Sequence, residues 1–225
     1  MQTLLPNEHL EQLDGNLQLI VSPAYTFTTD SLLLARFAAI RSHETACDLG
    51  TGCGVIPLLW CAEKTGEITA VDVQEAACAQ LERSLSLNGL EDRVTVVHAD
   101  LRQQHPLLPA GAFDLVTMNP PYYAAGTGKQ SRDNSDRLAK HETACTLEDA
   151  VMAAARLLKN GGRFCLCQKP ERLTDVLCTL RAYKLEPKRI RFAAQTAHKA
   201  PFLVLVEARR GGNPGVRVED LLTLQ

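Results

Sequence analysis

This sequence of 225 residues lacks the features that mark membrane and secreted proteins. No apolar run approaches the ~20 residues that a membrane-spanning helix needs. The first nine residues lack the basic stretch and the long apolar segment of a secretory signal peptide. Internal repeats and low-complexity tracts are also missing. With 45% hydrophobic and 22% charged residues, the composition is ordinary for a globular protein. We expect a cytoplasmic protein without a membrane partner.

The eight cysteines include no C-x-x-C pair, which is the usual spacing of zinc sites and redox motifs. Cys165 and Cys167 stand two residues apart in an apolar segment, so on a strand both side chains would point to the same face. Small apolar residues buried in a reducing cytosol explain this usage. We therefore expect no metal site.

The formal net charge is only −2, but the charge is unevenly distributed along the chain. Residues 1–150 hold 10 basic and 20 acidic residues, whereas residues 151–225 hold 14 basic and 6 acidic residues. A basic C-terminal part is compatible with a side that faces a polyanion. Solvated surface charge is the commoner explanation of such a pattern.

Apolar strands alternate with helices along the chain. The predicted helices cover residues 55–64, 75–88, 147–159 and 170–181. The predicted strands cover residues 44–49, 67–72, 94–100, 113–119, 163–168, 188–193 and 202–208. This alternation predicts an α/β fold, with a doubly wound, mostly parallel seven-stranded sheet. The last two strands would be antiparallel edge strands. The polar segment 123–146 interrupts the alternation, and we interpret it as a substrate loop that orders on binding.

A glycine-rich turn follows the first predicted strand, in the segment Asp48-Leu-Gly-Thr-Gly-Cys-Gly54. Gly50, Gly52 and Gly54 allow the backbone to turn sharply and to approach a ligand closely. Their G-x-G-x-G spacing differs from the G-x-G-x-x-G of dinucleotide-binding proteins. A pyrophosphate would sit poorly beside the carboxylate of Asp48. The pattern favours a cationic ligand with an amino-acid tail.

Three predicted strands end in an acidic residue: Asp48, Asp72 and Asp100. In a doubly wound sheet these strand ends border the ligand crevice. Asp72 lies 22 residues after Gly50, close to the ~20-residue spacing of a ribose-hydroxyl acceptor. Asp100 is placed to accept from the amino group of an adenine. Each acid alone is equally well explained as a helix N-cap or as a solvated strand end. Together with the glycine turn, they resemble the class I S-adenosylmethionine-dependent methyltransferases.

The segment Asn119-Pro120-Pro121-Tyr122 follows the fourth predicted strand and therefore faces the same crevice. The two prolines fix the backbone and leave carbonyl groups exposed. The Asn119 amide oxygen and the Pro120 carbonyl would accept the two hydrogens of a planar amino group, and Tyr122 would stack on a flat substrate. Positioning would be the main contribution to methyl transfer. Glutamine side chains, adenine N6 and guanine N2 all satisfy this geometry, and a Pro-Pro turn with a capping Asn is the alternative explanation.

Most of the chain, roughly residues 15–218, resembles one family, the bacterial tRNA adenine-N6 methyltransferases that modify valine tRNA beside the anticodon. The resemblance is carried by the two motifs above and by further segments, which are residues 25–38, 141–143, 157–164, 187–192, 201–208 and 212–216. It implies S-adenosylmethionine as the cofactor and tRNA as the partner. The last residues, 219–225, depart from the apolar, tyrosine-ended tail expected of the family.

The resemblance also implies a division of the chain into a cap over the cofactor, residues 1–30, and a methyltransferase domain, residues 31–225. In this arrangement Tyr25, Phe27, Thr28 and Asp30 would line the methionine part of the cofactor. Tyr25 and Phe27 are equally explained as core aromatic residues. The full predicted cofactor-binding set is Tyr25, Phe27, Thr28, Asp30, Asp48, Gly50, Thr51, Gly52, Cys53, Gly54, Asp72, Val73, Asp100, Leu101 and Asn119.

Basic residues in the 123–146 segment and in the C-terminal part are candidates for phosphate contacts, which orient a nucleic acid without reading its sequence. On a strand, Lys188 and Ile190 would share one face, and Arg189 and Arg191 the other. A solvated edge strand is the alternative explanation. The residues predicted to contact RNA are Lys129, Arg132, Lys188, Arg189, Arg191 and Lys199.

The sequence thus predicts N6-methylation of an adenine in tRNA. The first alternative is methylation of a glutamine in a protein such as a release factor, although the ~24 residues before Tyr25 leave no room for the N-terminal helical domain usual in those enzymes. Methylation of guanine N2 in ribosomal RNA is a second alternative. A third is an RNA-binding module without catalytic activity, against which the intact Asn119–Tyr122 motif and Asp72 argue.

Overall fold

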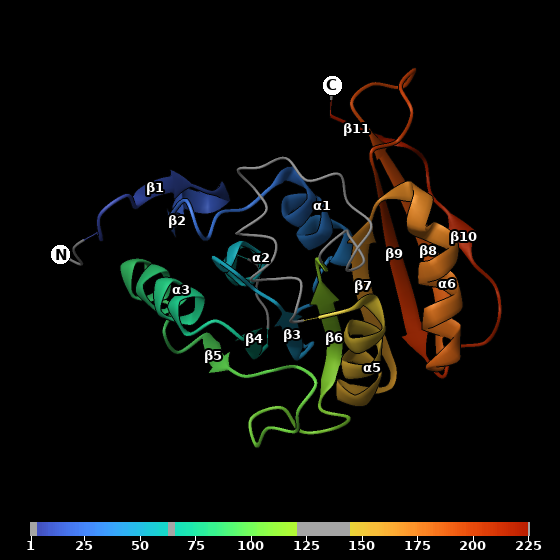
Figure 1. The fold of residues 1–225 in the computed structure, drawn as a ribbon, viewed down its shortest axis with the longest axis horizontal. Helices are drawn as coiled ribbons and strands as arrows, with labels where there is room; N and C mark the ends of the chain where they lie inside the picture. The colour runs from blue at the N-terminus through green and yellow to red at the C-terminus, as the bar shows by residue number, and fades with distance from the viewer. Residues whose placement is uncertain (1–3, 63–65, 121–144, 225) are drawn as a thin grey trace.

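The computed structural model describes residues 4–62, 66–120 and 145–224. Its main sheet contains seven long strands in the order β8-β9-β7-β6-β3-β4-β5. The five strands from β7 to β5 run parallel, and β9 is antiparallel to both of its neighbours. Their bounds are β3 Ala46–Leu49, β4 Ile68–Asp72, β5 Val94–His98, β6 Phe113–Met118, β7 Leu158–Gln168, β8 Leu185–Ala194 and β9 Leu203–Arg210. The predicted doubly wound, mostly parallel sheet is confirmed (Figure 1).

The order of the C-terminal strands is more elaborate than expected. The antiparallel strand β9 lies between β7 and β8, inside the sheet. Two short strands, β10 (Arg217–Val218) and β11 (Leu222–Thr223), pair in parallel with β8. The outer edge of β8 is therefore covered by residues 217–223, most of which belong to the C-terminal tail that differs from the expected family pattern. This pairing supplies hydrogen-bond partners to an edge that would otherwise be open.

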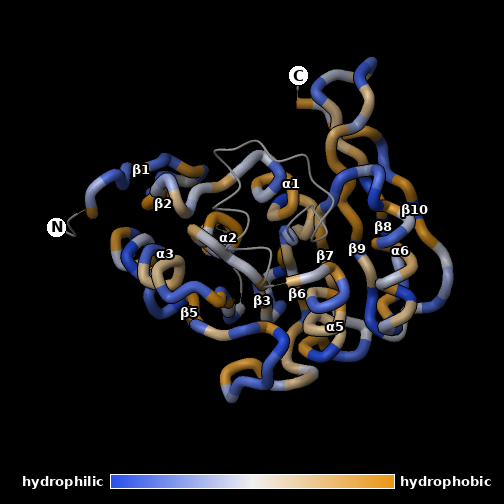
Figure 2. Tube along the Cα trace, viewed as in Figure 1, coloured by the Kyte–Doolittle hydropathy of each residue, from blue (hydrophilic) through white to orange (hydrophobic). Residues whose placement is uncertain are grey.

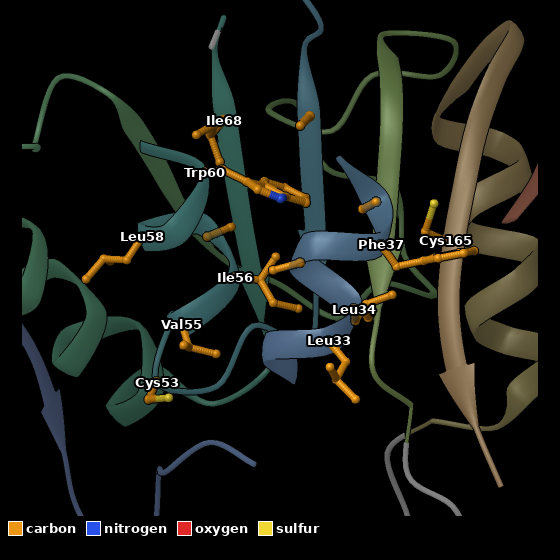
Figure 3. Close-up of a cluster of buried hydrophobic side chains, with 14 of the residues drawn as sticks. Leu33, Leu34, Phe37, Cys53, Val55, Ile56, Leu58, Trp60, Ile68 and Cys165 are labelled. Atoms are coloured by element: carbon orange, nitrogen blue, oxygen red, sulfur yellow. The ribbon is translucent and has the colours of Figure 1, made fainter. Parts of the chain in front are cut away.

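Helices cover both faces of the sheet. On one face α1 (Thr29–Ala38), α2 (Val55–Ala62) and α3 (Glu75–Asn88) enclose an apolar cluster. On the other face α5 (Leu147–Leu157) and α6 (Leu173–Ala182) enclose a second cluster. Figure 3 shows the first cluster, in which Phe37 of α1 points towards the strand that carries Cys165. Figure 2 shows that hydrophilic stretches lie in the connecting loops, including the tip of the β8–β9 connection.

Two predicted helix boundaries are wrong. The helix expected over residues 147–159 ends at Leu157, and residues 160–162, expected beyond it, belong to strand β7. The physical reason is burial, because Leu157 and Leu158 are both fully buried and Leu158 pairs with Phe113 of β6. The helix expected from Pro170 begins with a 3₁₀ turn, η2 (Pro170–Arg172), before α6. Cys165 and Cys167 do share one face of β7, as predicted.

The N-terminal segment forms a hairpin of β1 (His9–Gln12) and β2 (Gln18–Val21), separated by the 3₁₀ turn η1 (Asp14–Asn16). Helix α3 binds the backbone of this segment through side chains at positions four residues apart. The Gln80 amide donates to the carbonyls of Ile20 and Tyr25, and the Ser84 hydroxyl accepts from the Ile20 amide. Asn88 both donates to and accepts from the backbone of Gln18. The segment is thereby attached to the same helix that follows Asp72.

A network of buried ion pairs connects the C-terminal end of α1 to the sheet. Arg163 of β7 is 3% exposed and binds Glu44 at 2.7 Å and Glu207 at 3.1 Å. Its guanidinium also donates to the carbonyl of Ala38 at 2.8 Å. Arg189 of β8 binds Glu207 at 2.9 Å. Because a helix C-terminus carries partial negative charge, two guanidinium groups there stabilise α1 in its position.

We expect Arg163→Met to lower the free energy of unfolding by about 3–5 kcal/mol, because it removes one of the two guanidinium partners of the buried Glu207 and the nearest cation of the partly buried Glu44. Arg36→Met is the matched control. Arg36 pairs with Asp14 at 2.9 Å, but both side chains are more than 60% exposed, so the loss should stay below about 1 kcal/mol. Urea unfolding of both variants measures the difference. Equal losses for the two would show that the network contributes no more than a surface pair.

Candidate active site

A cavity of about 510 Å³ lies at the carboxyl ends of β3, β4, β5 and β6. The strand order changes direction between β3 and β6, and ligands of doubly wound sheets bind at such a switch point. Most of the lining residues lie in the last residues of a strand or shortly after its end. They are Ala24, Tyr25, Thr26, Thr28, Gly50, Gly52, Val71, Asp72, Val73, Gln74, Ala99, Asp100, Leu101, Met118, Asn119 and Cys145.

The glycine turn forms one wall of this cavity. Gly50, Gly52 and Gly54 all have positive φ angles, of 65°, 55° and 84°. A Cβ atom on Gly52 would meet nothing within 4 Å, so Gly52 faces open space. A Cβ atom on Gly54 would overlap the side chain of Leu81 in α3. The first two glycines therefore shape the cavity, whereas Gly54 allows close packing of the turn against α3.

Asp72 holds the turn and the end of β4 together. Its carboxylate accepts from the backbone amide of Gly52 at 2.8 Å and from that of Gln74 at 2.9 Å. The Tyr25 hydroxyl donates to the Gln74 side chain at 3.0 Å, which connects the N-terminal segment to the same strand end. Burial, with the nearby Asp72 carboxylate, raises the pKa of Tyr25 above its ordinary value. The phenol is therefore protonated and available as a donor.

Asp48 lies beneath the turn and does not line the cavity. It is 1% exposed and accepts from the Thr117 hydroxyl of β6 at 2.7 Å. Burial raises the pKa of Asp48 to about 7. Of the three acids expected around the ligand, the structure therefore brings only Asp72 and Asp100 to the cavity. Asp48 instead joins β3 to β6 directly below the switch point.

Asp100 is engaged by a neighbour. Its carboxylate accepts from the Arg102 guanidinium at 2.6–3.0 Å and from the Arg102 backbone amide at 3.0 Å. The bond to this side chain holds the pKa of Asp100 below its ordinary value. Asp100 is therefore an ionised acceptor at the cavity rim. Any ligand amino group that it binds would share the carboxylate with Arg102.

Asn119 follows directly on β6 and lines the cavity. In the sheet, β6 lies on one side of β3, whereas β4 and β5, which precede Val73 and Asp100, lie on the other side. The amide nitrogen of Asn119 donates to the Ser31 hydroxyl at 3.0 Å, and its oxygen accepts from the Cys167 thiol at 3.1 Å. Pro120 follows and is buried. The remaining predicted residues of this motif, Pro121 and Tyr122, lie outside the described residues, as do Lys129 and Arg132.

The other predicted cofactor residues divide into two groups. Those that line the cavity are Tyr25, Thr28, Val73 and Leu101. Those that do not line it are Phe27, Asp30, Thr51, Cys53 and Gly54. Phe27 packs against the apolar cluster under α1 and α2, the alternative that the sequence left open.

Several lining residues were not predicted. Gln74, Ala99 and Met118 stand within two residues of a predicted site residue, so neighbourhood in the chain was an available signal. Cys145 comes just before α5, far from either motif, and only the fold brings it to the cavity. The apolar members of the lining suit the flat faces of a nucleobase, and Asp72 suits the hydroxyl groups of a ribose.

The basic residues of β8 mostly bind other parts of the chain. Lys188 donates to the carbonyl of Asn213, and Arg191 to that of Asp220. Arg189 binds Glu207 and Glu219 and stacks over the ring of Phe37 at 4.4 Å. Lys199, by contrast, is exposed in the β8–β9 connection, which extends beyond the carboxyl ends of the parallel strands (Figure 1). The strand expected to face phosphates is thus mainly engaged with the C-terminal tail.

Comparison with known proteins identifies this arrangement. The family model of the methyltransferase small domain matches residues 28–178, more than half of the chain. A tRNA1(Val) (adenine(37)-N6)-methyltransferase of Tolumonas auensis is 30% identical over 203 residues, which cover 88% of this chain and 81% of the relative. The enzyme of the same name from Aeromonas hydrophila is 28% identical, over 82% of this chain and 77% of its own. This chain belongs to the methyltransferase small domain family and to the family of these relatives.

Solved structures agree with this methyltransferase fold. A predicted O-methyltransferase from Agrobacterium tumefaciens superposes with a TM-score of 0.68 at 23% identity, over 87% of both chains. A ribosomal protein L11 methylase from Lactobacillus delbrueckii superposes with a TM-score of 0.57 at 16% identity, over 85% of this chain and 84% of its own. The resemblance drawn from the sequence is thereby confirmed at the level of fold and family.

Within residues 4–62, 66–120 and 145–224, no helix is long and apolar enough to cross a membrane. The same residues contain no cluster of three or more His, Cys, Asp or Glu side chains that could hold a metal ion.

We expect Gly54→Ala to lower the free energy of unfolding by about 2–5 kcal/mol, because it adds both a strained backbone and an overlap with Leu81. Gly89→Ala is the matched control. Gly89 has a similar φ of 65° but no atom within 4 Å of an added Cβ, so only the backbone strain of about 1–2 kcal/mol applies. Denaturant unfolding measures both variants. A loss for Gly54→Ala no larger than that of the control would contradict the packing role.

Proposed function

We propose that this protein transfers a methyl group from S-adenosylmethionine to the exocyclic N6 of an adenine in tRNA, next to the anticodon of a valine tRNA, in the cytoplasm. Membership in the methyltransferase family supports the reaction type, and the names of the relatives support the substrate. The observation that carries the proposal is the cavity at the switch point. It has the Asp72–glycine turn on one side and Asn119, the start of the Asn-Pro-Pro-Tyr motif, on another.

The cavity fits the proposed cofactor. Asp72 is an acceptor already oriented by two backbone amides, and it would bind the ribose hydroxyl groups. Val71, Val73 and Leu101 would contact the adenine, while Asp100 would accept from its amino group. The N-terminal residues Tyr25 and Thr28 would cover the methionine part, in keeping with a cap formed by residues 1–30. When bound, the cofactor supplies an activated methyl group on a sulfonium.

The chain's own contribution to methyl transfer would be positional. The side-chain oxygen of Asn119 and the carbonyl of Pro120 would accept the two hydrogens of the adenine amino group. This holds the nitrogen in place and directs its lone pair out of the ring plane, towards the methyl group. Well-oriented reactants account for a large share of such rate enhancements. Lys199, at the same edge of the sheet, would contribute a phosphate contact.

Incubation with methyl-labelled S-adenosylmethionine and tRNA from cells that lack this activity tests the proposal. Digestion to nucleosides should yield labelled N6-methyladenosine from the anticodon loop of a valine tRNA. A second reaction contains a release factor in place of tRNA. Label in a glutamine of that protein, with none in tRNA, would contradict the proposed substrate and support the alternative.

We expect Asn119→Ala to lower kcat by at least about 100-fold, because the acceptor amine loses its positioning. The Kd for S-adenosylmethionine should stay within about twofold. Asp72→Ala should instead weaken cofactor binding by about 10- to 100-fold, the usual cost of a charge-assisted hydrogen bond. Titration calorimetry and initial rates separate the effects, with Asp175→Ala on α6, outside the cavity, as the control. Near-normal rates for Asn119→Ala would refute the assigned role.

A further inference from the structure

The side chain of Asn119 is held at both ends by residues from two other elements. Its amide nitrogen donates to the hydroxyl of Ser31, in the first turn of α1, at 3.0 Å. Its amide oxygen accepts from the thiol of Cys167, near the end of β7, at 3.1 Å. Neither side-chain torsion of Asn119 can change without breaking one of these contacts. Ser31 and Cys167 were not singled out as site residues in the sequence.

The chemistry of the two contacts suits an amide that must present its oxygen to a substrate. A serine hydroxyl is a good acceptor for an amide N–H, whereas a thiol is only a weak donor. Amide oxygens have two lone pairs, and a weak donor on one of them does not compete strongly with a substrate amino group. Cys167 is fully buried, so this donor is in place before substrate binds. The strong contact fixes the nitrogen end, and the weak contact orients the oxygen end.

The position of Ser31 is in turn set by the ion-pair network. At the far end of α1, Arg189 donates to the carbonyl of Phe37 at 3.1 Å and Arg163 to that of Ala38 at 2.8 Å. Arg163 belongs to β7, the strand that also carries Cys167. Both partners of Asn119 are therefore tied to one strand. Helix α1 cannot slide along the sheet without breaking buried, charge-assisted bonds.

We propose that Ser31 and Cys167 are positioning residues, which hold the Asn119 amide in the orientation that methyl transfer requires. This inference rests on the proposed function, in which the Asn119 oxygen accepts a hydrogen of the substrate amino group. Ser31 and Cys167 act through Asn119 and not through contact with substrate. Their effect should therefore appear in kcat and not in cofactor binding.

Rates with tRNA test the serine. Ser31→Ala should lower kcat by about 10- to 100-fold, the scale of a misplaced catalytic group, and leave the Kd for S-adenosylmethionine within about twofold. Ser31→Thr keeps the hydroxyl and should recover most of the rate. Arg36→Met, which changes an exposed side chain of the same helix outside both the cap and the cavity lining, is the control and should match the wild type. A wild-type kcat for Ser31→Ala would overturn the proposal.

The thiol is tested in the same assay. Cys167→Ala should reduce kcat more than Cys165→Ala, which removes an equally buried thiol from the same face of β7 but away from Asn119. Cys167→Ser, which restores a donor to the amide oxygen, should recover activity relative to Cys167→Ala. Equal rates for the two alanine variants would show that Cys167 acts only through packing.

Nuclear magnetic resonance separates this proposal from the proposed function, because it needs no substrate. In the ligand-free protein, the side-chain NH₂ hydrogens of Asn119, assigned through their loss in Asn119→Ala, should exchange with water slowly. The exchange should be at least about tenfold faster in Ser31→Ala and unchanged in Arg36→Met, since a lost hydrogen bond of this kind has about that effect on an equilibrium. Unchanged exchange in Ser31→Ala would overturn the positioning role. If the exchange rates differ between the variants as expected but the protein fails to methylate tRNA, only the substrate assignment is overturned.

Discussion

The cavity depends on the two hydrogen bonds that the carboxylate of Asp72 accepts from the backbone. The carboxylate binds the amide of Gly52 on the glycine turn and the amide of Gln74 at the start of α3. Two neighbouring strand ends, β3 and β4, are thereby connected across the floor of the site. The bond to the Gly52 amide is made from a turn whose glycines have left-handed backbone conformations. The two bonds leave the carboxylate oriented towards the space that a ribose would occupy.

A second set of charged residues fixes helix α1, which contacts Asn119, relative to the sheet. Glu207 of β9 lies between Arg163 and Arg189, and both arginines bind the C-terminal end of α1. Glu219 of the C-terminal tail binds Arg189 as well. The first turn of α1, which contacts Asn119, is thus connected to the last strands of the chain. The C-terminal tail belongs to the framework that holds the site, although it lies far from the cavity.

The sequence was most informative where one residue type alone satisfies the backbone. The glycine turn and the helix stop at Gly89 were predictable because a positive φ requires glycine there. The placement of Asp72 and Asp100 at the cavity was predictable, because a parallel sheet brings the carboxyl ends of neighbouring strands together, although β5 ends at His98, two residues before Asp100. Membership of the family could be inferred from the two motifs, and the comparisons confirm it.

Other features depended on contacts between distant segments, for which the sequence carries no local signal. Arg189 and Arg191 are of the residue type that binds phosphates, so the sequence suggested a phosphate-binding strand. The C-terminal tail that pairs with this strand forms only two-residue strands, which are too short to show an alternating hydrophobic pattern in the sequence. Asp48 resembles the other two strand-end acids in sequence, and only the fold shows that Thr117 covers it. Helix α5 likewise ends at Leu157, before the Gly161–Gly162 pair that the sequence suggested as the stop, because Leu158 is buried as the first residue of β7.

A crystal structure with bound S-adenosylhomocysteine would show where the cofactor binds. We expect the ligand to occupy the cavity at the ends of β3, β4, β5 and β6. The Asp72 carboxylate should lie within hydrogen-bonding distance, ~2.7–3.2 Å, of the ribose hydroxyl groups, and the sulfur should face Asn119. A ligand bound elsewhere on the protein, or with its ribose away from Asp72, would refute the role of Asp72 as the ribose acceptor in this cavity.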